Sequence, residues 1–188
     1  MKKNLIIALF LLTGSIGFAQ TEVRIGPKVG VNISSFAPSP HAEIQTLVGY
    51  QAGGVASFSL SKLLSVQPEL FYSAEGATSP GMKYSLNYLR LPLLIHLQHA
   101  SGFYAQAGPQ AGYLLSGKSK DKLLDKQYEL KGLMGHFETS FVVGLGYRLQ
   151  QGFGFDLRYA AGLSRLQADS EVKLQTVTAG IHYLLPTH

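Results

Sequence analysis

The sequence predicts an all-β fold, an eight-stranded antiparallel up-and-down transmembrane β-barrel. Three observations support this prediction: period-two alternation in eight segments, a low charge content, and connections that alternate between long and short. Charged residues make up only 14% of the chain, against roughly 25% in an ordinary soluble domain, whereas 46% are hydrophobic. A soluble barrel coats its outside with charge, and this chain has too little for such a coat. We therefore expect the apolar faces to meet lipid and the polar faces to line the interior.

The clearest alternation lies between Leu64 and Leu97, which is predicted as two strands joined by a polar loop at Gly76–Met82. In the second of these strands, leucine or isoleucine occupies every other position from Leu89 onward, and residues such as Arg90 lie between them. Alternation over this length is typical of a strand with two unlike environments.

The connections between the predicted strands alternate in length. Those after strands one, three, five and seven are long and polar, and the others are tight turns near residues 61–62, 98–101 and 151–152. Outer-membrane barrels show this asymmetry, whereas a soluble barrel of the lipocalin type has no reason to alternate this way. The remaining strands are predicted at Glu22–Ser34, Leu47–Leu60, Gly102–Ser116, Phe137–Gln150, Phe153–Arg165 and Glu171–Leu185.

The N-terminal segment predicts export. Residues 1–19 are predicted to be a cleaved signal peptide and residues 20–188 the outer-membrane barrel domain. Lys2 and Lys3 give a basic start, Leu5–Leu12 is an apolar run too short to span a bilayer, and small residues precede the cleavage site. A retained N-terminal anchor is the alternative. The chain has no cysteine, which excludes disulfides and a lipoprotein anchor.

The polar faces are predicted to fill the barrel. An eight-stranded barrel is just wide enough for its own side chains, and charges removed from bulk water need partners. We expect a cross-linked interior without an open pore, and aromatic girdles near the strand ends. The predicted structural network of charged lumen residues is Arg24, Lys28, Glu69, Arg90, Glu138, Arg148, Asp156 and Arg158.

Several motifs, among them QPEL, YLRLPLL and AGPQ, follow one another in a characteristic order. They lie in the pieces Gly26–Ile33, Leu64–Gly76, Asn87–Ile95, Phe103–Leu115 and Phe141–Arg148, which span nearly the whole mature chain. This order resembles the PorT-like outer-membrane β-barrel family of Bacteroidetes-type bacteria. The resemblance implies a barrel in the outer membrane of the cell envelope. One member of that family is linked to protein secretion, and the resemblance implies no catalytic residues.

The sequence favours a non-enzymatic structural or interaction role, carried out by a monomer through its outward loops. It predicts no catalytic residue, no cofactor and no metal site, because the six histidines form no pair with zinc-ligand spacing. The glycine pairs at residues 144–146 and 152–154 are followed by no helix, so they do not form a nucleotide-binding loop. No run of like charges suggests contact with nucleic acid.

The segment Gly117–His136 is the longest predicted loop and the best candidate for contact with a partner. Its charges can simply solvate a hairpin extension. The alternative is docking on outer-membrane lipid and lipopolysaccharide, or on proteins of a secretion apparatus, and the formal net charge of +5 suits anionic headgroups. The candidate residues are Lys118, Lys120, Lys122, Lys126 and Lys131.

Two other functions stay open at this stage. The family resemblance implies an accessory component of a protein secretion apparatus. A lipid A-modifying enzyme ranks lower. Ser164, His182 and Asp156 share a face of neighbouring strands, but that face is the predicted lumen, whereas such an enzyme needs its triad facing lipid.

Overall fold

The computed structural model describes residues 22–37, 45–130, 135–165 and 171–185. The predicted signal peptide lies outside these residues. No helix in the described part of the chain is long and apolar enough to cross a membrane. The strands are β1 (Glu22–Ala37), β2 (Gln45–Ser59), β3 (Leu64–Ser79), β4 (Met82–Gln98), β5 (Phe103–Asp121), β6 (Gln127–Glu129), β7 (Phe137–Arg148), β8 (Phe153–Gly162) and β9 (Lys173–Tyr183).

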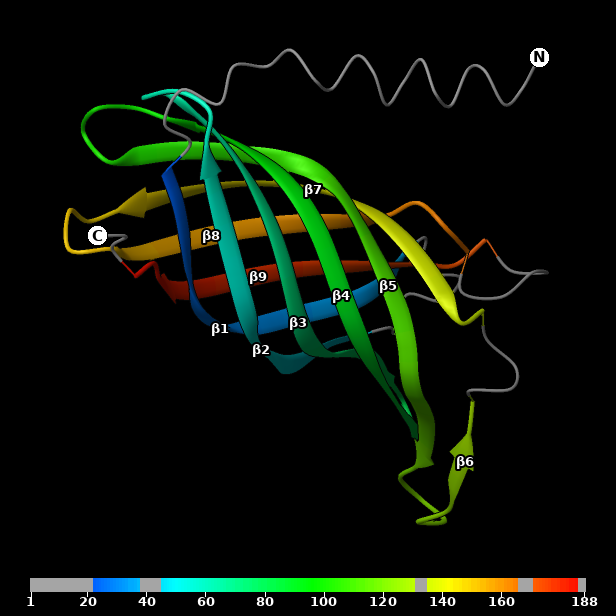
Figure 1. The fold of residues 1–188 in the computed structure, drawn as a ribbon. Helices are drawn as coiled ribbons and strands as arrows, with labels where there is room; N and C mark the ends of the chain where they lie inside the picture. The colour runs from blue at the N-terminus through cyan, green and yellow to red at the C-terminus, as the bar shows by residue number, and fades with distance from the viewer. Residues whose placement is uncertain (1–21, 38–44, 131–134, 166–170, 186–188) are drawn as a thin grey trace, which may run out of the picture.

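The strands form one antiparallel sheet that closes on itself (Figure 1). The order is β4-β3-β2-β1-β9-β8-β7-β5-β6, and pairing of β4 with β5 completes the ring. β1 pairs with the last strand, from Lys28 opposite His182 to Ala37 opposite Lys173. Strand β6 pairs with β5 alone and stands outside the ring. The closed barrel therefore has eight strands, which confirms the fold predicted from the sequence.

The apolar side chains of the barrel wall face outward. In β4, Leu91 is 53% exposed and Ile95 54%, whereas Arg90 is 2% and His96 1% exposed. The same alternation runs through the other barrel strands. A closed sheet leaves no backbone edge unpaired, and its outer surface is apolar. The wall therefore meets both demands of a lipid environment, which are hydrogen-bonded backbone groups and apolar side chains on the outside.

Aromatic ring pairs mark both ends of the apolar wall. Rings that lie together on the outside match the interfacial girdles of membrane barrels, where an amphipathic ring sits at headgroup level. At the end where β1 begins the pairs are Phe103–Tyr147 and Phe153–Tyr183, with ring centroids 4.8 and 4.7 Å apart; at the other end they are Tyr113–Phe137 and Tyr50–Tyr72, at 5.2 and 5.9 Å.

Three tight turns lie at the end of the barrel where β1 begins and β9 ends (Figure 1). They comprise residues 60–63, 99–102 and 149–152. Gly102 and Gly152 take the same place in two of these turns, with φ of 98° and 97°, a left-handed conformation that favours glycine. Outer-membrane barrels carry short turns on the periplasmic side, so we expect this end to face the periplasm, and we call it the periplasmic mouth.

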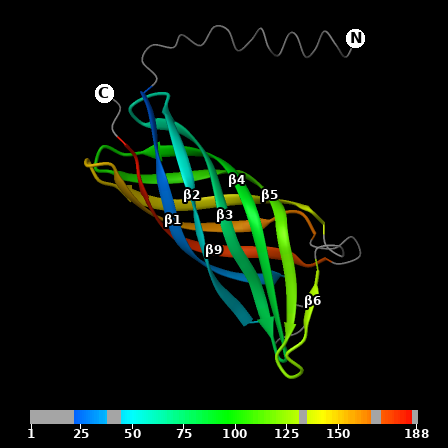
Figure 2. The same ribbon diagram turned by 60° about the horizontal axis from the view of Figure 1, so that its bottom comes forward.

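At the opposite end of the barrel, two segments that were predicted to be loops are largely β-strand. In the segment Gly76–Met82, pairing of β3 with β4 continues to Ser79 opposite Met82, so only residues 80–81 form the turn. Within Gly117–His136, residues up to Asp121 extend β5, and β6 pairs with that extension. The prediction of loops was wrong because these segments are polar on both faces and show no apolar alternation. The resulting sheet of β3, β4, β5 and β6 projects beyond the barrel (Figures 1 and 2).

A β-bulge aligns this projecting sheet with the barrel wall. Leu114 lies opposite Tyr88 and Ser116 lies opposite Asn87, so Leu115 is an extra residue in β5. The bulge shifts the alternation of β5 by one position. Beyond it, the outward face carries even-numbered residues, beginning with Ser116, which accepts a hydrogen bond from Asn87 Nδ2 at 2.8 Å.

A charge on the outer wall is expected to destabilise the protein strongly. Leu93, which is 47% exposed, lies near the middle of the outward stripe of β4. Leu93→Arg should lower the free energy of unfolding in lipid vesicles by about 2–4 kcal/mol, because the cation meets hydrocarbon. Urea titration followed by circular dichroism measures this change. The control Leu123→Arg, at an 87% exposed position of the projecting hairpin, should change stability by at most about 0.5 kcal/mol. Equal effects of the two substitutions would contradict the outward orientation.

Candidate functional site

The interior holds a first cluster of charges that joins β1, β3 and β8. The guanidinium of Arg158 donates to both oxygens of Glu69, at 2.6 and 2.8 Å. Lys28 Nζ lies 3.0 Å from Asp156 Oδ2 and 3.5 Å from Glu69 Oε1. These side chains are buried, and the two cations balance the two carboxylates. Bidentate arginine–carboxylate geometry is the form in which such charges are best retained away from water.

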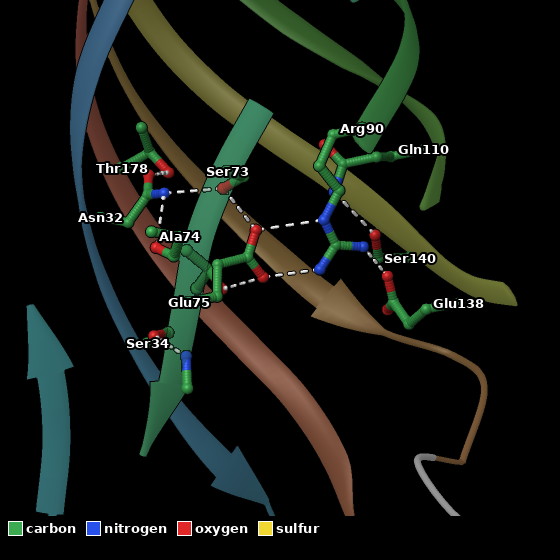
Figure 3. Close-up of polar contacts among 12 residues, drawn as sticks. Asn32, Ser34, Ser73, Ala74, Glu75, Arg90, Gln110, Glu138, Ser140 and Thr178 are labelled. Carbon is green, nitrogen blue, oxygen red and sulfur yellow. Dashed lines mark hydrogen bonds and ion pairs between the residues drawn. The ribbon is translucent and has the colours of Figure 1, made fainter. Parts of the chain in front are cut away.

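A second cluster joins β3, β4 and β7 (Figure 3). Arg90 donates from Nε and Nη2 to the two oxygens of Glu75, at 3.1 and 2.6 Å, and its Nη1 pairs with Glu138. Its guanidinium also lies over the ring of Tyr88, with 4.1 Å between Cζ and the ring centroid. The five donors of arginine lie in a fixed plane, which lets one side chain link two carboxylates and stack on an aromatic ring.

Neutral side chains extend this second cluster toward β1 and β9 through hydrogen bonds (Figure 3). Ser73 donates to Glu75 Oε1 at 2.6 Å and accepts from Asn32 Nδ2 at 2.8 Å. Thr178 donates to Asn32 Oδ1 at 2.9 Å, and Ser34 accepts from the backbone N–H of Gly76 at 2.8 Å. Strands that are distant in the sequence are thus linked across the lumen.

Apolar side chains fill the lumen on the outer side of these charges. Leu86, Tyr88, Leu114 and Leu174 form a buried cluster, against which Phe36 and Val172 pack. Sequence reasoning missed this cluster, because its apolar residues lie on strand faces that were predicted to be polar.

The structure places the predicted charged residues in different surroundings. Arg90 and Glu138 join the second cluster, and the first contains Lys28, Glu69, Asp156 and Arg158. Arg148 lies at the periplasmic mouth and donates to the amide oxygens of Gln98 and Gln67, at 3.0 and 3.3 Å. Arg24 lies at the same end, half-exposed, and pairs with Glu22 at 2.6 Å.

Sequence reasoning missed Glu75, the carboxylate that holds Arg90 by two hydrogen bonds. The position shares its alternation with Glu69 and Ser73, and this signal could have identified it. It was overlooked because Glu75 directly precedes the segment that was predicted to be a loop.

The structure does not bring Ser164, His182 and Asp156 together as a catalytic triad. His182 Nδ1 lies 3.4 Å from Asp156 Oδ2 inside the barrel. Ser164 follows β8 at the outer end, where its hydroxyl accepts a hydrogen bond from the backbone N–H of Thr139 at 2.9 Å. Among the described residues, there is also no group of three or more His, Cys, Asp or Glu side chains able to hold a metal ion.

Basic residues gather on the outward face of the projecting sheet. Lys83 lies opposite Lys120, and Lys118 lies opposite Ser85. All three lysines are exposed and lie on the face that continues the apolar wall, Lys118 and Lys120 because the bulge shifts the alternation of β5. Lys120 and Lys118 therefore occupy a strand rather than the predicted loop. We call Lys83, Lys118 and Lys120 the basic face.

The other predicted partner residues lie nearer the tip of the hairpin. Lys122 and Lys126 flank the turn, where Leu123 is 87% and Leu124 65% exposed. Lys131 lies outside the described residues. The hydrogen bond from Lys120 and the positive charge of that side chain lower the pKa of Asp125, whose Oδ1 lies 2.6 Å from Lys120 Nζ.

An apolar outer wall, a closed ring of strands and an ionic lumen together define an integral outer-membrane β-barrel protein. A family model described as "Outer membrane protein beta-barrel domain" matches residues 18–167. The chain belongs to this family, and it is a protein of the bacterial outer membrane.

Solved structures share the fold at low sequence identity. Neisserial surface protein A (NspA) superposes with a TM-score of 0.59 and 10% identity, over 85% of this chain and 96% of that chain. Ail, the attachment invasion locus protein of Yersinia pestis, superposes with a TM-score of 0.54 and 14% identity, over 87% of this chain and 99% of that chain. No match was found among curated proteins.

Removing one carboxylate from the first cluster is expected to be costly. Glu69→Leu leaves Lys28 and Arg158 facing Asp156 alone, so the free energy of unfolding should fall by about 3–5 kcal/mol. Glu22→Leu breaks an exposed pair and should cost at most about 1 kcal/mol. Urea unfolding in lipid vesicles measures both values. If Glu69→Leu cost no more than Glu22→Leu, the buried charges would not be stabilising the barrel.

Proposed function

We propose that this protein is a non-enzymatic structural and interaction protein of the outer membrane, whose basic face binds the phosphate groups of lipopolysaccharide. The observation that supports the proposal most is the position of Lys83, Lys118 and Lys120 on the outward surface of the projecting sheet, which continues the lipid-facing wall. Outer-leaflet phosphates lie at the boundary between hydrocarbon and the external medium, and the basic face begins at Lys118, four residues along β4 from the height of Leu89, the last outward leucine of that strand.

The electrostatics of the basic face favour an anionic ligand. Lys83 and Lys120 lie directly opposite each other on neighbouring strands, an arrangement that repels unless an anion intervenes. Within the described part of the chain, neither Lys83 nor Lys118 forms an ion pair, although Glu129 of β6 lies opposite Lys118, and Lys120 forms only the exposed pair with Asp125. Each basic side chain near an anionic surface contributes about 1 kcal/mol to binding.

The contacts of the buried polar side chains support a non-enzymatic role. The buried charges are engaged with one another across the lumen, where they link strands. Ser164 is distant from His182 and Asp156, so these residues offer no support for a lipid A-modifying enzyme. Because eight strands close the ring without a second chain, we infer that the protein acts as a monomer.

A second candidate is an accessory role in a protein secretion apparatus. The resemblance of pieces such as Asn87–Ile95 and Phe141–Arg148 to the PorT-like family favours it, and it would place the chain in a Bacteroidetes-type bacterium. The projecting hairpin, with Leu123 and Leu124 exposed at its turn, offers a surface for a protein partner. Co-purification from membranes in mild detergent tests this candidate. Recovery of secretion proteins that depends on Leu123 and Leu124 would favour it over the lipid-binding role.

Neutralising the basic face is expected to weaken binding of phosphorylated lipid A. The triple substitution Lys83→Gln, Lys118→Gln and Lys120→Gln removes about 3 kcal/mol of attraction, so affinity should fall by about 100-fold. Fluorescent bisphosphorylated lipid A, titrated into the refolded protein in neutral detergent at low and high salt, measures the change. Binding by the natural protein should weaken as salt rises.

The matched control neutralises lysines that lie on the same hairpin but nearer its tip. Lys122→Gln with Lys126→Gln should leave lipid A affinity within about three-fold of the natural value, since these residues flank the turn of the hairpin, farther from the wall than the basic face. Dephosphorylated lipid A should not distinguish the variants. Equal loss from both sets of substitutions, or no loss from either, would contradict binding at the basic face.

A further inference from the structure

The periplasmic mouth of the barrel contains a polar depression that the proposed function does not use. Two adjoining cavities, of about 510 and 490 Å³, share Arg24, Gln98 and Arg148 in their linings. Their walls come from the three tight turns and from the first residues of β1. This depression lies at the opposite end of the barrel from the basic face.

Arg148 is the central cation of this depression. Its guanidinium donates to Gln98 and Gln67, which are both neutral, and lies 5.6 Å from the ring centroid of Tyr104. Among the residues that the structure describes, no carboxylate lies within ion-pairing distance of Arg148. By contrast, Arg90 and Arg158 in the lumen each bind carboxylates through two or more nitrogen atoms.

The lining of the depression carries more positive than negative charge. Among the described residues, the lining contains three cations, Arg24, Lys62 and Arg148. It contains one carboxylate, that of Glu22. The pair of Arg24 with Glu22 is exposed, with 32% and 44% of the two side chains accessible, so an incoming anion can compete for Arg24. Hydroxyl and amide groups of Ser59, Ser61, Gln150 and Gln151 surround the cations and can supply further donors.

We propose that the periplasmic mouth binds a phosphate-bearing ligand, with Arg148 as the principal donor and with Arg24 and Lys62 neutralising the remaining charge. The planar guanidinium fits two phosphate oxygens at once. A phosphate group, with three or four acceptor oxygens, also suits several cations and hydroxyls better than a single carboxylate does. The ligand reaches this end either as a phospholipid headgroup of the inner leaflet or as a soluble phosphate compound of the periplasm.

The test uses the mature chain refolded in two environments. In neutral detergent, inorganic phosphate is titrated and followed by calorimetry. In nanodiscs of mixed phosphatidylglycerol and phosphatidylcholine, native mass spectrometry counts the phosphatidylglycerol retained by the protein. Circular dichroism and the mobility of unheated protein on gels verify that each variant is folded.

Arg148→Gln should weaken binding by about 10- to 100-fold, because hydrogen bonds to a charged group are lost. Arg148→Lys retains the charge but loses the planar fork, so its loss should be smaller than that of Arg148→Gln. Lys122→Gln, at the other end of the barrel, should bind as the natural protein does.

The two arms separate the sources of the ligand. Binding of inorganic phosphate that depends on Arg148 supports a soluble ligand, and retention of phosphatidylglycerol alone that depends on Arg148 supports a headgroup. The proposal is overturned if neither probe binds, or if folded Arg148→Gln binds as well as the natural protein. Binding of lipid A at the basic face is measured separately, so failure of one proposal leaves the other intact.

Discussion

The fold depends on a constraint that lipid imposes: a group that can form hydrogen bonds cannot be left without a partner in hydrocarbon. The closed ring of strands satisfies the backbone. The bidentate contact of Arg158 with Glu69 shows how the side chains satisfy the same constraint, because both charges lie inside the ring and engage each other. Low charge content, outward leucines and an ionic lumen are three consequences of this one requirement.

The two charged clusters also determine which strands belong together across the lumen. The first links β1, β3 and β8, and the second links β3, β4 and β7. Each cluster would leave a buried charge unpaired if a strand slipped by one residue, because such a slip turns every side chain to the other face. The ion pairs therefore contribute to the specificity of strand register as well as to stability. The strand β3 takes part in both clusters, through Glu69 and Glu75, and so holds a central place in the barrel.

Both ends of the barrel differ from the lumen, because the rims meet bulk water, whereas the charges inside the lumen pair with each other. At the outer end, β3, β4 and β5 continue past the wall, and the bulge at Leu115 keeps the lysines of β5 on the face that borders lipid. At the periplasmic end, Arg148 lies among neutral partners and the lining is positive. Function is proposed at the rims because the charges of the lumen are occupied with each other.

The sequence predicted the wall well and the rims poorly, for a physical reason. Alternation from Leu89 to Leu97 reports directly on lipid outside and a polar interior, so strand type and orientation could be read from it. The extension of β5 carries polar residues on both faces, so its sequence lacks the apolar–polar alternation that would predict its pairing with β4. Leu86 and Leu114 follow the alternation that turns Arg90 and Gln110 inward, but as apolar residues on a polar face they could not be recognised as lumen residues from the pattern. Which charges would meet could not be predicted either, because register across the lumen decides it. Glu75 was absent from the predicted network, and Arg148 has no carboxylate partner among the described residues.

The most direct test of the account is a measurement of which methyl groups touch lipid. Leu93, Leu94 and Ile95 are consecutive in β4, with exposed fractions of 47%, 0% and 54%. In nuclear magnetic resonance spectra of the methyl-labelled protein in lipid nanodiscs, Leu93 and Ile95 should show cross-relaxation with lipid acyl chains, and Leu94 should show none. Contact of Leu94 with lipid, with Leu93 and Ile95 protected, would contradict the account.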